Sequence, residues 1–440
     1  MTATMTVNDG FFGFGAQATG APQGTIITEP KTVDQLRQVF LSLSVSGTPP
    51  RPFFVSIAEG DYDFGGSEFI IRTRRLTFQA NPNSRVVLKN LTLRIDLASI
   101  DRVLIRGLVF RSDRRTSSDA IRLRPADDAT PTPGTTAKAN VRIANCSFDG
   151  YKDMAICCRS ASTFPQLLAT IDHCFFFDSD PGQPNTLPQN AADDVKLPFV
   201  DRGAINFGSL ETPLQPGEDP TTTNRAQQPN NARVTIAENA FFEVWRRTPR
   251  IANGNFGHIF NNVVYRWGFG NNDQPPKHGA NTWRGIEIGG GEGVTGGGDN
   301  GSALIEANRF IPWKEKKELT DTITLNANTV VDIGVTASKD QPPLMNQPNR
   351  FDDPDGNART VVFPPPTQGF SGFSFIGDTR YTDVGRQKPP VTPAGTADWI
   401  AIVQGAGPGE PRERKTPDEK ARRRLLKALD PNETSNLSDE

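Results

Sequence analysis

One short pattern recurs along the middle of the chain and constrains the fold more than any other feature. An aliphatic residue is followed three positions later by a second residue, and two positions after that by an apolar one. The copies begin at Ile105, Ile143, Ile171, Ile236, Ile259, Ile305 and Leu325. Their starting points are 38, 28, 65, 23, 46 and 20 residues apart. Because one turn of a solenoid needs only about 20 to 30 residues, the longer intervals indicate insertions on one side.

The middle position of this pattern favours a stack of like residues inside the molecule. It is Cys in the second and third copies and Asn in the last four, at Asn239, Asn262, Asn308 and Asn328. An Asn amide can both donate and accept, so each one can bond to the next around successive turns. The alternative is a sandwich of unrelated strands whose turns contain Asn, but a sandwich would not readily keep one offset through seven copies. The sequence therefore predicts an all-β solenoid.

Composition agrees with short strands and excludes some partners. The chain of 440 residues has 40 Gly, 36 Pro and 28 Phe, which favours many short strands separated by turns. Lys and Arg number 48 against 50 Asp and Glu, so we expect neither nucleic acid nor an anionic membrane as a partner. No stretch approaches the length of a transmembrane helix. The four cysteines match no zinc-binding spacing and are expected to be buried thiols.

The chain divides into four regions by composition. Residues 1–24 are expected to form an irregular arm, and residues 25–338 the solenoid, with long loops at 178–231 and 267–302 that build a binding site. Thr32 and Gln35 form a capping box, which predicts a short amphipathic helix at the start of the solenoid. Residues 339–410 are rich in Pro and are expected to wrap the solenoid. Residues 411–440 form a charged tail in which a second capping box predicts a mobile surface helix.

A basic turn is the candidate site for chemistry. Arg246-Arg247-Thr248-Pro249-Arg250 lies between two strand-like segments of the repeat, residues 234–241 and 258–265. The plainer interpretation is a solvated basic turn.

Several motifs, taken in order, resemble those of the pectate lyase/pectin lyase family of polysaccharide lyases over about residues 10 to 332. They are Gly13-Phe14-Gly15-Ala16, Val103 to Phe110, and Arg247-Thr248-Pro249-Arg250 followed by His258 and Asn261-Asn262. The resemblance implies a right-handed parallel β-helix and cleavage of 1,4-linked polygalacturonate or pectin by β-elimination. It also implies a secreted protein, although the N-terminus shows no signal peptide. We expect a monomer that binds an acidic polysaccharide.

The resemblance also assigns roles to residues. Arg247 matches the catalytic base, and Arg250 matches a basic residue that holds a substrate carboxylate, a task suited to its forked donors. Arg246 would be the match if the alignment slips by one. The family lysine has two candidates, Lys196 and Arg202. The resemblance also implies a calcium site, because the family's calcium ligands map onto Asp119, Asp149 and Asp153. Asp119 and Asp149 both fall past strand patterns, and Ca²⁺ takes several oxygen ligands. The plainer interpretation is surface loops that happen to be rich in Asp.

The chain departs from the family pattern in ways that leave alternatives open. A further family Arg is replaced by Ala252, and the spacing from Arg247 to His258 is that of pectin lyases, which act on methylated substrate without calcium. The family's Asp-His pair appears one coil late, at Asp172-His173. A calcium-dependent pectate lyase is the first expectation. The alternatives are a calcium-independent pectin lyase, a hydrolase that uses close carboxylates, and a non-catalytic β-helix that binds carbohydrate or serves a structural role.

Overall fold

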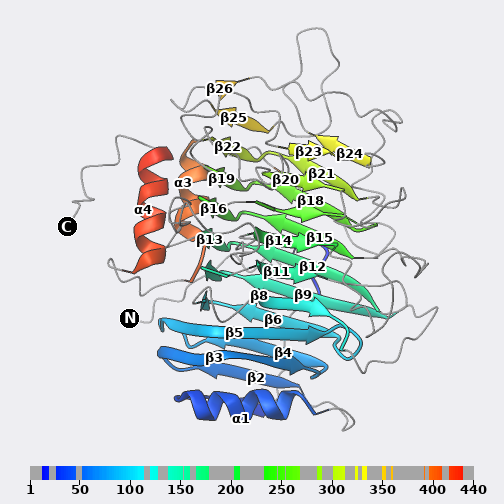
Figure 1. The fold of residues 1–440 in the computed structure, drawn as a ribbon, viewed down its shortest axis with the longest axis vertical. Coiled ribbons are helices and arrows are strands. Elements are labelled where there is room, and N and C mark those ends of the chain that lie inside the picture. The colour runs from blue at the N-terminus through cyan, green and yellow to red at the C-terminus, as the bar shows by residue number, and fades with distance from the viewer. Residues whose placement is uncertain are drawn as a thin grey trace, which may run out of the picture.

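The chain folds into a right-handed parallel β-helix with three strand faces (Figure 1). The computed structural model describes residues 12–18, 26–45, 52–112, 119–126, 137–151, 153–158, 165–177, 203–208, 232–244, 246–252, 254–267, 285–289, 301–312, 323–325, 330–333, 349–352, 358–359, 391, 396–408 and 416–429. Strands that neighbour one another on a face belong to successive coils. In the described part of the chain, the paired strands are parallel throughout, apart from an antiparallel pair at the C-terminal end of the stack.

The first face is a ten-stranded sheet within the described residues. Its strands, in order, are β1 (Ile26–Thr28), β2 (Phe53–Ile57), β4 (Arg75–Ala80), β6 (Arg102–Arg106), β9 (Lys138–Ala144), β12 (Gln166–Asp172), β15 (Arg233–Ala237), β18 (Phe256–Phe260), β21 (Ser302–Glu306) and β24 (Val330–Ile333).

The second and third faces share two long strands at the N-terminal end, β3 (Gly60–Ile71) and β5 (Val86–Asp96). The second face continues from β5 through β7 (Val109–Arg111), β10 (Ser147–Asp149), β13 (Phe175–Phe177), β16 (Ala240–Phe242), β19 (Val263–Tyr265), β22 (Arg309–Ile311), β25 (Arg350–Asp352) and β26 (Ala358–Arg359). The third face continues from β5 through β8 (Asp119–Arg124), β11 (Met154–Cys158), β14 (Gly203–Phe207), β17 (Arg250–Ile251), β20 (Ile286–Ile288) and β23 (Ile323–Leu325).

The recurring sequence pattern marks the corner between the first and second faces. In the coils from β6 to β21, the last first-face residue is followed by one residue in the left-handed backbone conformation, as at Asn145 (φ 51°) and Asn261 (φ 52°). The next residue points into the core and begins the stack that the sequence predicts. Asn262 Nδ2 donates to Asn308 Oδ1 over 2.9 Å, and Asn239 Nδ2 donates to Asn262 Oδ1 over 3.0 Å. The predicted Asn stack is therefore confirmed for these copies.

The final copy of the pattern was assigned wrongly. Leu325 belongs to β23 on the third face, whereas Val330 begins β24 on the first face and pairs with Ser302. Asn328 lies outside the described residues. Asn349 occupies the last described position of the stack, where its Oδ1 accepts from Asn308 Nδ2 over 2.9 Å.

Apolar residues on the second-face strands fill the interior beside this stack. Phe110, Phe148, Phe176 and Phe241 lie parallel, with successive ring centroids 5.2, 5.0 and 4.9 Å apart. All four side chains are buried, and burial of each contributes about 1.5–3 kcal/mol to stability. The four cysteines are buried thiols, as expected, and none of them forms a disulfide bond. Cys146 and Cys174 extend the stack below Asn239, whose Oδ1 accepts from Cys174 N.

Helices cover the N-terminal end of the stack and its second face. Helix α1 (Val33–Leu43) begins at the predicted capping box, with Gln35 N donating to Thr32 Oγ1, and Phe40 packs against Phe64, Phe69 and Phe78. Helices α3 (Thr396–Gly405) and α4 (Pro417–Leu429) lie along the second face (Figure 1). The sequence predicted a mobile surface helix here, and the structure buries the apolar side of α4 against the second face.

The two long loops are also more structured than the sequence suggested. The region 178–231 contains β14, and the region 267–302 contains β20. Each is the third-face strand of its coil, so each coil is completed inside a stretch that shows no periodicity in sequence.

The N-terminal residues 12–18 cross the first face, where Phe14 N donates to Thr235 Oγ1 and Gly15 N donates to Thr170 Oγ1.

Candidate functional site

The basic turn lies at the corner where the chain passes from the second face to the third. It follows β16 and leads directly into β17. Backbone hydrogen bonds fix it on both sides: Ile205 N donates to Arg247 O over 3.0 Å, and Thr248 N donates to Gly285 O over 3.0 Å. The Thr248–Pro249 peptide bond is cis. The turn is therefore held between the preceding coil and the following one.

Arg247 adopts a left-handed backbone conformation with φ of 57°. Glu243 and Arg266 have positive φ directly after second-face strands, whereas Arg247 lies four residues after Glu243 in the same corner. The Arg247 side chain is buried, at 5% of its full exposure. Its guanidinium donates to Met154 Sδ at 3.7 Å and lies 4.0 Å from Asp153 Oδ1.

Arg250 stands in a row of polar residues along the third face. In β17 it pairs in register with Asn206 of β14 on one side and Glu287 of β20 on the other. Its Nε lies 3.6 Å from Glu287 Oε1. The same row continues through Cys157 of β11 to Arg122 of β8. These residues alternate with core residues such as Ile205 and Ile251, so their side chains point away from the core.

The three predicted calcium ligands are not brought together as a metal site. Asp119 and Asp149 are both buried, whereas Asp153 is half-buried at the corner next to Arg247. Asp119 accepts from Arg122 Nε at 2.6 Å and from Met154 N at 3.2 Å. Asp149 accepts from Arg111 Nε at 3.2 Å.

Among the residues that the structure describes, no group of three or more His, Cys, Asp and Glu side chains is placed to hold a metal ion. The physical reason is that guanidinium groups already supply the positive charge beside Asp119 and Asp149. Burial lowers the pKa of Arg122, but Asp119 and then Glu68 raise it by more, so Arg122 stays a cation. A calcium ion needs six to eight oxygen ligands and would have to displace these arginines. The residues present therefore do not fit the calcium site that the resemblance implied.

The remaining predicted residues divide into two groups. Lys196 and Arg202 lie outside the described residues. Arg246 is half-buried, and its backbone bridges to Gly203, with Ala204 N donating to Arg246 O over 3.3 Å. Ala252 directly follows β17, is buried and carries no charge.

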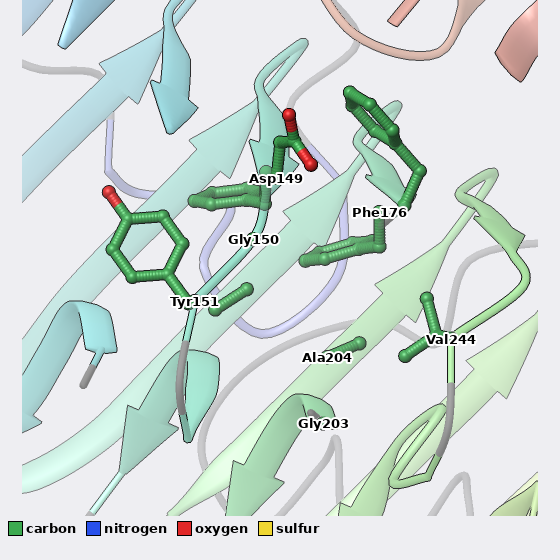
Figure 2. A pocket seen from close by; sticks show the side chains of 10 residues that line it. Asp149, Gly150, Tyr151, Phe176, Gly203, Ala204 and Val244 are labelled. Carbon is green, nitrogen blue, oxygen red and sulfur yellow. The ribbon is translucent and has the colours of Figure 1, made fainter. Parts of the chain in front are cut away.

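A small cavity lies inside the corner next to this site (Figure 2). Its volume is about 30 Å³, and its walls include Phe148, Tyr151, Phe176, Ala204 and Val244. A cavity of this volume holds at most about one or two water molecules. Burial raises the pKa of Tyr151 well above its ordinary value, and its hydroxyl donates to Leu91 O. The cavity is too small for a sugar and is part of the interior.

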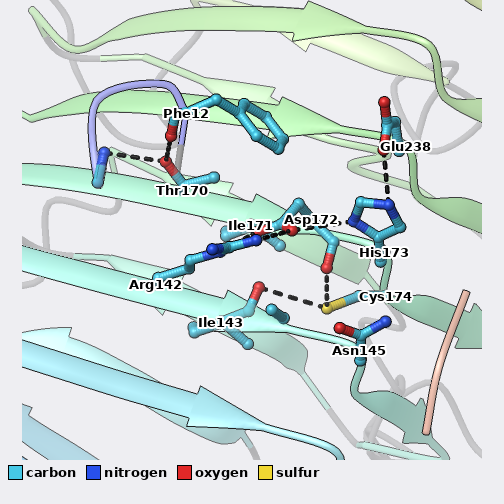
Figure 3. Close-up of polar contacts among 12 residues, drawn as sticks. Phe12, Arg142, Ile143, Asn145, Thr170, Ile171, Asp172, His173, Cys174 and Glu238 are labelled. Carbon is cyan, nitrogen blue, oxygen red and sulfur yellow. Dashed lines mark hydrogen bonds and ion pairs between the residues drawn. The ribbon is translucent and has the colours of Figure 1, made fainter. Parts of the chain in front are cut away.

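The Asp-His pair forms a separate polar cluster on the far side of the coil (Figure 3). Arg142 makes two hydrogen bonds to Asp172, of 2.9 and 2.8 Å. His173 bonds to Asp172 at 2.9 Å through Nδ1 and to Glu238 at 2.6 Å through Nε2. Burial lowers the pKa of His173, but the two carboxylates raise it by more, to about 10. The cluster lies at the corner between the first and second faces, away from Arg247.

Several site residues were missed in the sequence. Arg111 and Arg122 neutralise the predicted metal ligands, and Glu287 pairs with Arg250. Asp119 and Arg122 are three apart in sequence, so this pair left a weak signal. Arg111 and Asp149 are 38 residues apart and meet only because their strands align.

In the described helices, none is long and apolar enough to cross a membrane.

Comparisons with known proteins give a likeness in architecture. No family model matches the chain, and no curated protein sequence matches it. Solved structures similar to it include pectate lyase II from Xanthomonas campestris (15% identity, 90% of this chain and 98% of that one, TM-score 0.45). Others are the cedar pollen allergen jun a 1 (14%, 91% and 93%, 0.48) and pectate lyase C from Erwinia chrysanthemi (12%, 93% and 98%, 0.43). At such identities and TM-scores, the right-handed parallel β-helix rests on the strand pairing described above, and no residue role is carried over.

Proposed function

We propose that this protein is a polysaccharide lyase that cleaves 1,4-linked polygalacturonate or pectin by β-elimination. The observation that carries the proposal is the arginine pair of the basic turn. Arg247 and Arg250 are fixed by backbone hydrogen bonds at one corner of the third face, beside a polar row that runs from coil to coil. Arg122 and Arg250 supply cations to this row, in which Glu287 is a carboxylate, and we propose that an elongated anionic chain is the substrate that suits these arginines.

In the proposed reaction, a base removes the proton at C5 of a uronate residue, and that electron pair then forms the C4–C5 double bond. The C4 oxygen leaves with the electron pair of the broken C4–O bond and takes up a proton from water. The negative charge that develops is shared with the adjacent carboxyl group, which must be stabilised by donors or cations. Arg250 is assigned to that carboxyl group because a guanidinium offers two parallel donors. Arg247 is assigned as the base.

The base assignment places a demand on Arg247, because arginine stays protonated in proteins. The proton has to be lost within the complex with substrate. Two features of its surroundings bear on this step. The side chain is buried, and one guanidinium nitrogen faces the uncharged sulfur of Met154. Asp153, at 4.0 Å, is the anion that accompanies the resting cation.

In this proposal, Arg111 and Arg122 supply the positive charge beside Asp149 and Asp119. No step is assigned to calcium, because Asp119 and Asp149 already accept hydrogen bonds from these arginines. This favours the calcium-independent alternative that the spacing of Arg247 and His258 suggested. Lys196 and Arg202 stay candidates for a further substrate contact.

The test is release of unsaturated product, followed by ultraviolet absorbance, from polygalacturonate and from methylated pectin. Each substrate is assayed with added calcium and with a chelator. We expect product both with added calcium and with the chelator, and its loss in Arg247→Ala while that variant still unfolds cooperatively on heating. Absence of product from both substrates under both conditions contradicts the proposal. Activity that disappears with chelator would restore the calcium prediction.

A second candidate is a non-catalytic β-helix that binds carbohydrate or serves a structural role. Two observations favour it: Ala252 replaces a family arginine, and the Arg247 side chain is only 5% exposed. Binding of polygalacturonate measured by calorimetry, together with no product, is the outcome that selects this candidate.

A further inference from the structure

Two buried polar side-chain atoms close to Arg250 have no hydrogen-bond partner in the described part of the chain. They are Oδ1 of Asn206 and Oγ1 of Thr248. Asn206 is 2% exposed and Thr248 is 1% exposed. Most buried polar groups in folded proteins are hydrogen-bonded, so each exception calls for a physical explanation.

Asn206 lies directly beside Arg250 on the third face. The two residues are register partners on β14 and β17, and adjacent strands in a sheet are about 4.8 Å apart. Ile205 and Phe207, on either side of Asn206, belong to the core. Because side chains alternate along a strand, the Asn206 amide points away from the core, on the same side as Arg250.

Thr248 precedes Arg250 by two residues in the basic turn. Its own backbone N–H donates to Gly285 O, and the carbonyl of Pro249 accepts from Glu287 N. These bonds hold the backbone on both sides of the hydroxyl. The hydroxyl can donate and accept, whereas Asn206 Oδ1 can only accept.

We infer that Asn206 and Thr248 determine specificity in a sugar subsite centred on Arg250, an inference that rests on the proposed function. Arg250 binds the uronate carboxylate, Asn206 Oδ1 accepts a hydrogen bond from a ring hydroxyl, and Thr248 Oγ1 bonds to a second ring oxygen. A site whose buried polar groups are satisfied only by the right hydroxyl rejects a substrate that lacks it. The two atoms are thus left without partners in the protein because the sugar supplies them.

The experiment removes each atom with a side chain of similar size and measures both stability and kinetics. In Asn206→Leu and Thr248→Val we expect a higher melting temperature, because a buried group without a partner is lost. We also expect KM for polygalacturonate to rise by at least about tenfold with kcat little changed, as for lost ground-state binding. A merely structural role would not raise stability and KM together.

Thr235→Val is the matched control. The hydroxyl of Thr235 is equally buried but accepts from Phe14 N, on the first face. Its loss is expected to lower the melting temperature and to leave KM unchanged. On the substrate side, polygalacturonate acetylated on its ring hydroxyls should raise KM for the wild-type protein and change KM little for Asn206→Leu.

Failure of the subsite and failure of the proposed function give different results. If the wild-type protein releases unsaturated product but both variants keep its KM, the two atoms hold water only and the subsite is overturned. If the wild-type protein releases no product from polygalacturonate or methylated pectin, the proposed function falls and the subsite with it. Thr248→Val decides the matter if Asn206→Leu does not fold.

Discussion

Buried carboxylates and guanidinium groups pair repeatedly along the coils. Asp119 faces Arg122, Asp149 faces Arg111, and Asp172 faces Arg142. Removing one partner from such a pair leaves an uncompensated charge in the interior, which costs more than the pair itself contributes. Because each carboxylate already has a guanidinium partner, it is not available to bind a metal ion. For this reason Asp119 and Asp149 do not form a calcium site.

Arg122→Met is expected to lower the stability of the protein. Asp119 would lose its guanidinium partner, and we expect a loss of about 1–3 kcal/mol, below the value for a fully buried pair because Arg122 is partly exposed. Chemical denaturation measures this change. Lys89→Met is the control, since its partner Asp61 is exposed and the pair contributes little. Equal losses in both variants would contradict the assignment.

The cluster around His173 gives the protein a pH-dependent contribution to stability. The pKa of His173 is about 10 in the folded protein, against an ordinary value of 6.5. Since the folded state binds the proton more tightly, this contribution is fully present below pH 6.5 and is lost as the pH rises towards 10. The charged groups facing His173 are Asp172 and Glu238, with Arg142 behind Asp172.

His173→Asn is expected to reduce this dependence. Asn tolerates the left-handed backbone at this position, so the change removes the titrating group with little strain. The melting temperature of the wild-type protein should exceed that of the variant at pH 6 and should approach it near pH 10. Glu238→Gln should shift the wild-type loss to lower pH. A difference in melting temperature that does not vary with pH would contradict the prediction.

Among the elements, the corner between the first and second faces carries the most regular interactions. Asn262 illustrates the pattern: its Nδ2 donates to Ile236 O at 2.9 Å, and its Oδ1 accepts from Asn239 N at 3.0 Å. The short pattern in the sequence predicted this corner because its residues are close together and repeat at one offset. Local spacing does not reveal which face a strand joins, and for that reason Leu325 was given to the wrong coil position.

Asn262→Ala is expected to destabilise the β-helix strongly. It removes the side-chain hydrogen bonds to three backbone groups of two coils, Asn239 N, Ile236 O and Phe260 O, and we expect a loss of about 3 kcal/mol or more in the free energy of unfolding. Denaturant titration measures it. The adjacent Asn261→Gly should change stability little, because the backbone there is left-handed and glycine accepts that conformation. A small effect at Asn262 would mean that water replaces the amide.

The third face was much harder to predict than the corner. Its strands β14 and β20 are five and three residues long and lie within polar sequence that has no period. The basic turn could be found because Arg246 to Arg250 are consecutive. The pairing of Arg250 with Glu287, and of Arg111 with Asp149, could not be predicted. These residues meet only through the register between strands of different coils.

In the molecule as a whole, the C-terminal helices form a second layer over the coils. Trp399 of α3 and Leu425 of α4 pack on the aromatic strip of the second face, which includes Phe175, Phe242 and Tyr265. Charged contacts flank the strip: Arg424 pairs with Glu243 at 2.9 Å, and Asp418 pairs with Arg85 at 2.9 Å. A charge-rich sequence suggested a solvated helix, but its apolar residues fall on one side and are covered.

Leu425→Ala should therefore lower the stability of the whole protein. Leu425 is fully buried, and such truncations cost about 2–5 kcal/mol. Lys427→Ala on the exposed side of α4 is the matched control and should have almost no effect. Thermal denaturation of the full chain gives both values. Equal and small effects would mean that α4 is mobile after all.

The contact between Arg85 and Asp418 joins residues 333 positions apart. During synthesis the early coils can stack on one another as they leave the ribosome, because each touches only its neighbours. The aromatic strip on the second face has no cover until α3 and α4 have also been made. At about 5–20 residues per second, this leaves the strip open for many seconds after Phe175 emerges. For that interval the strip is an uncovered apolar surface, and the last helix completes its burial.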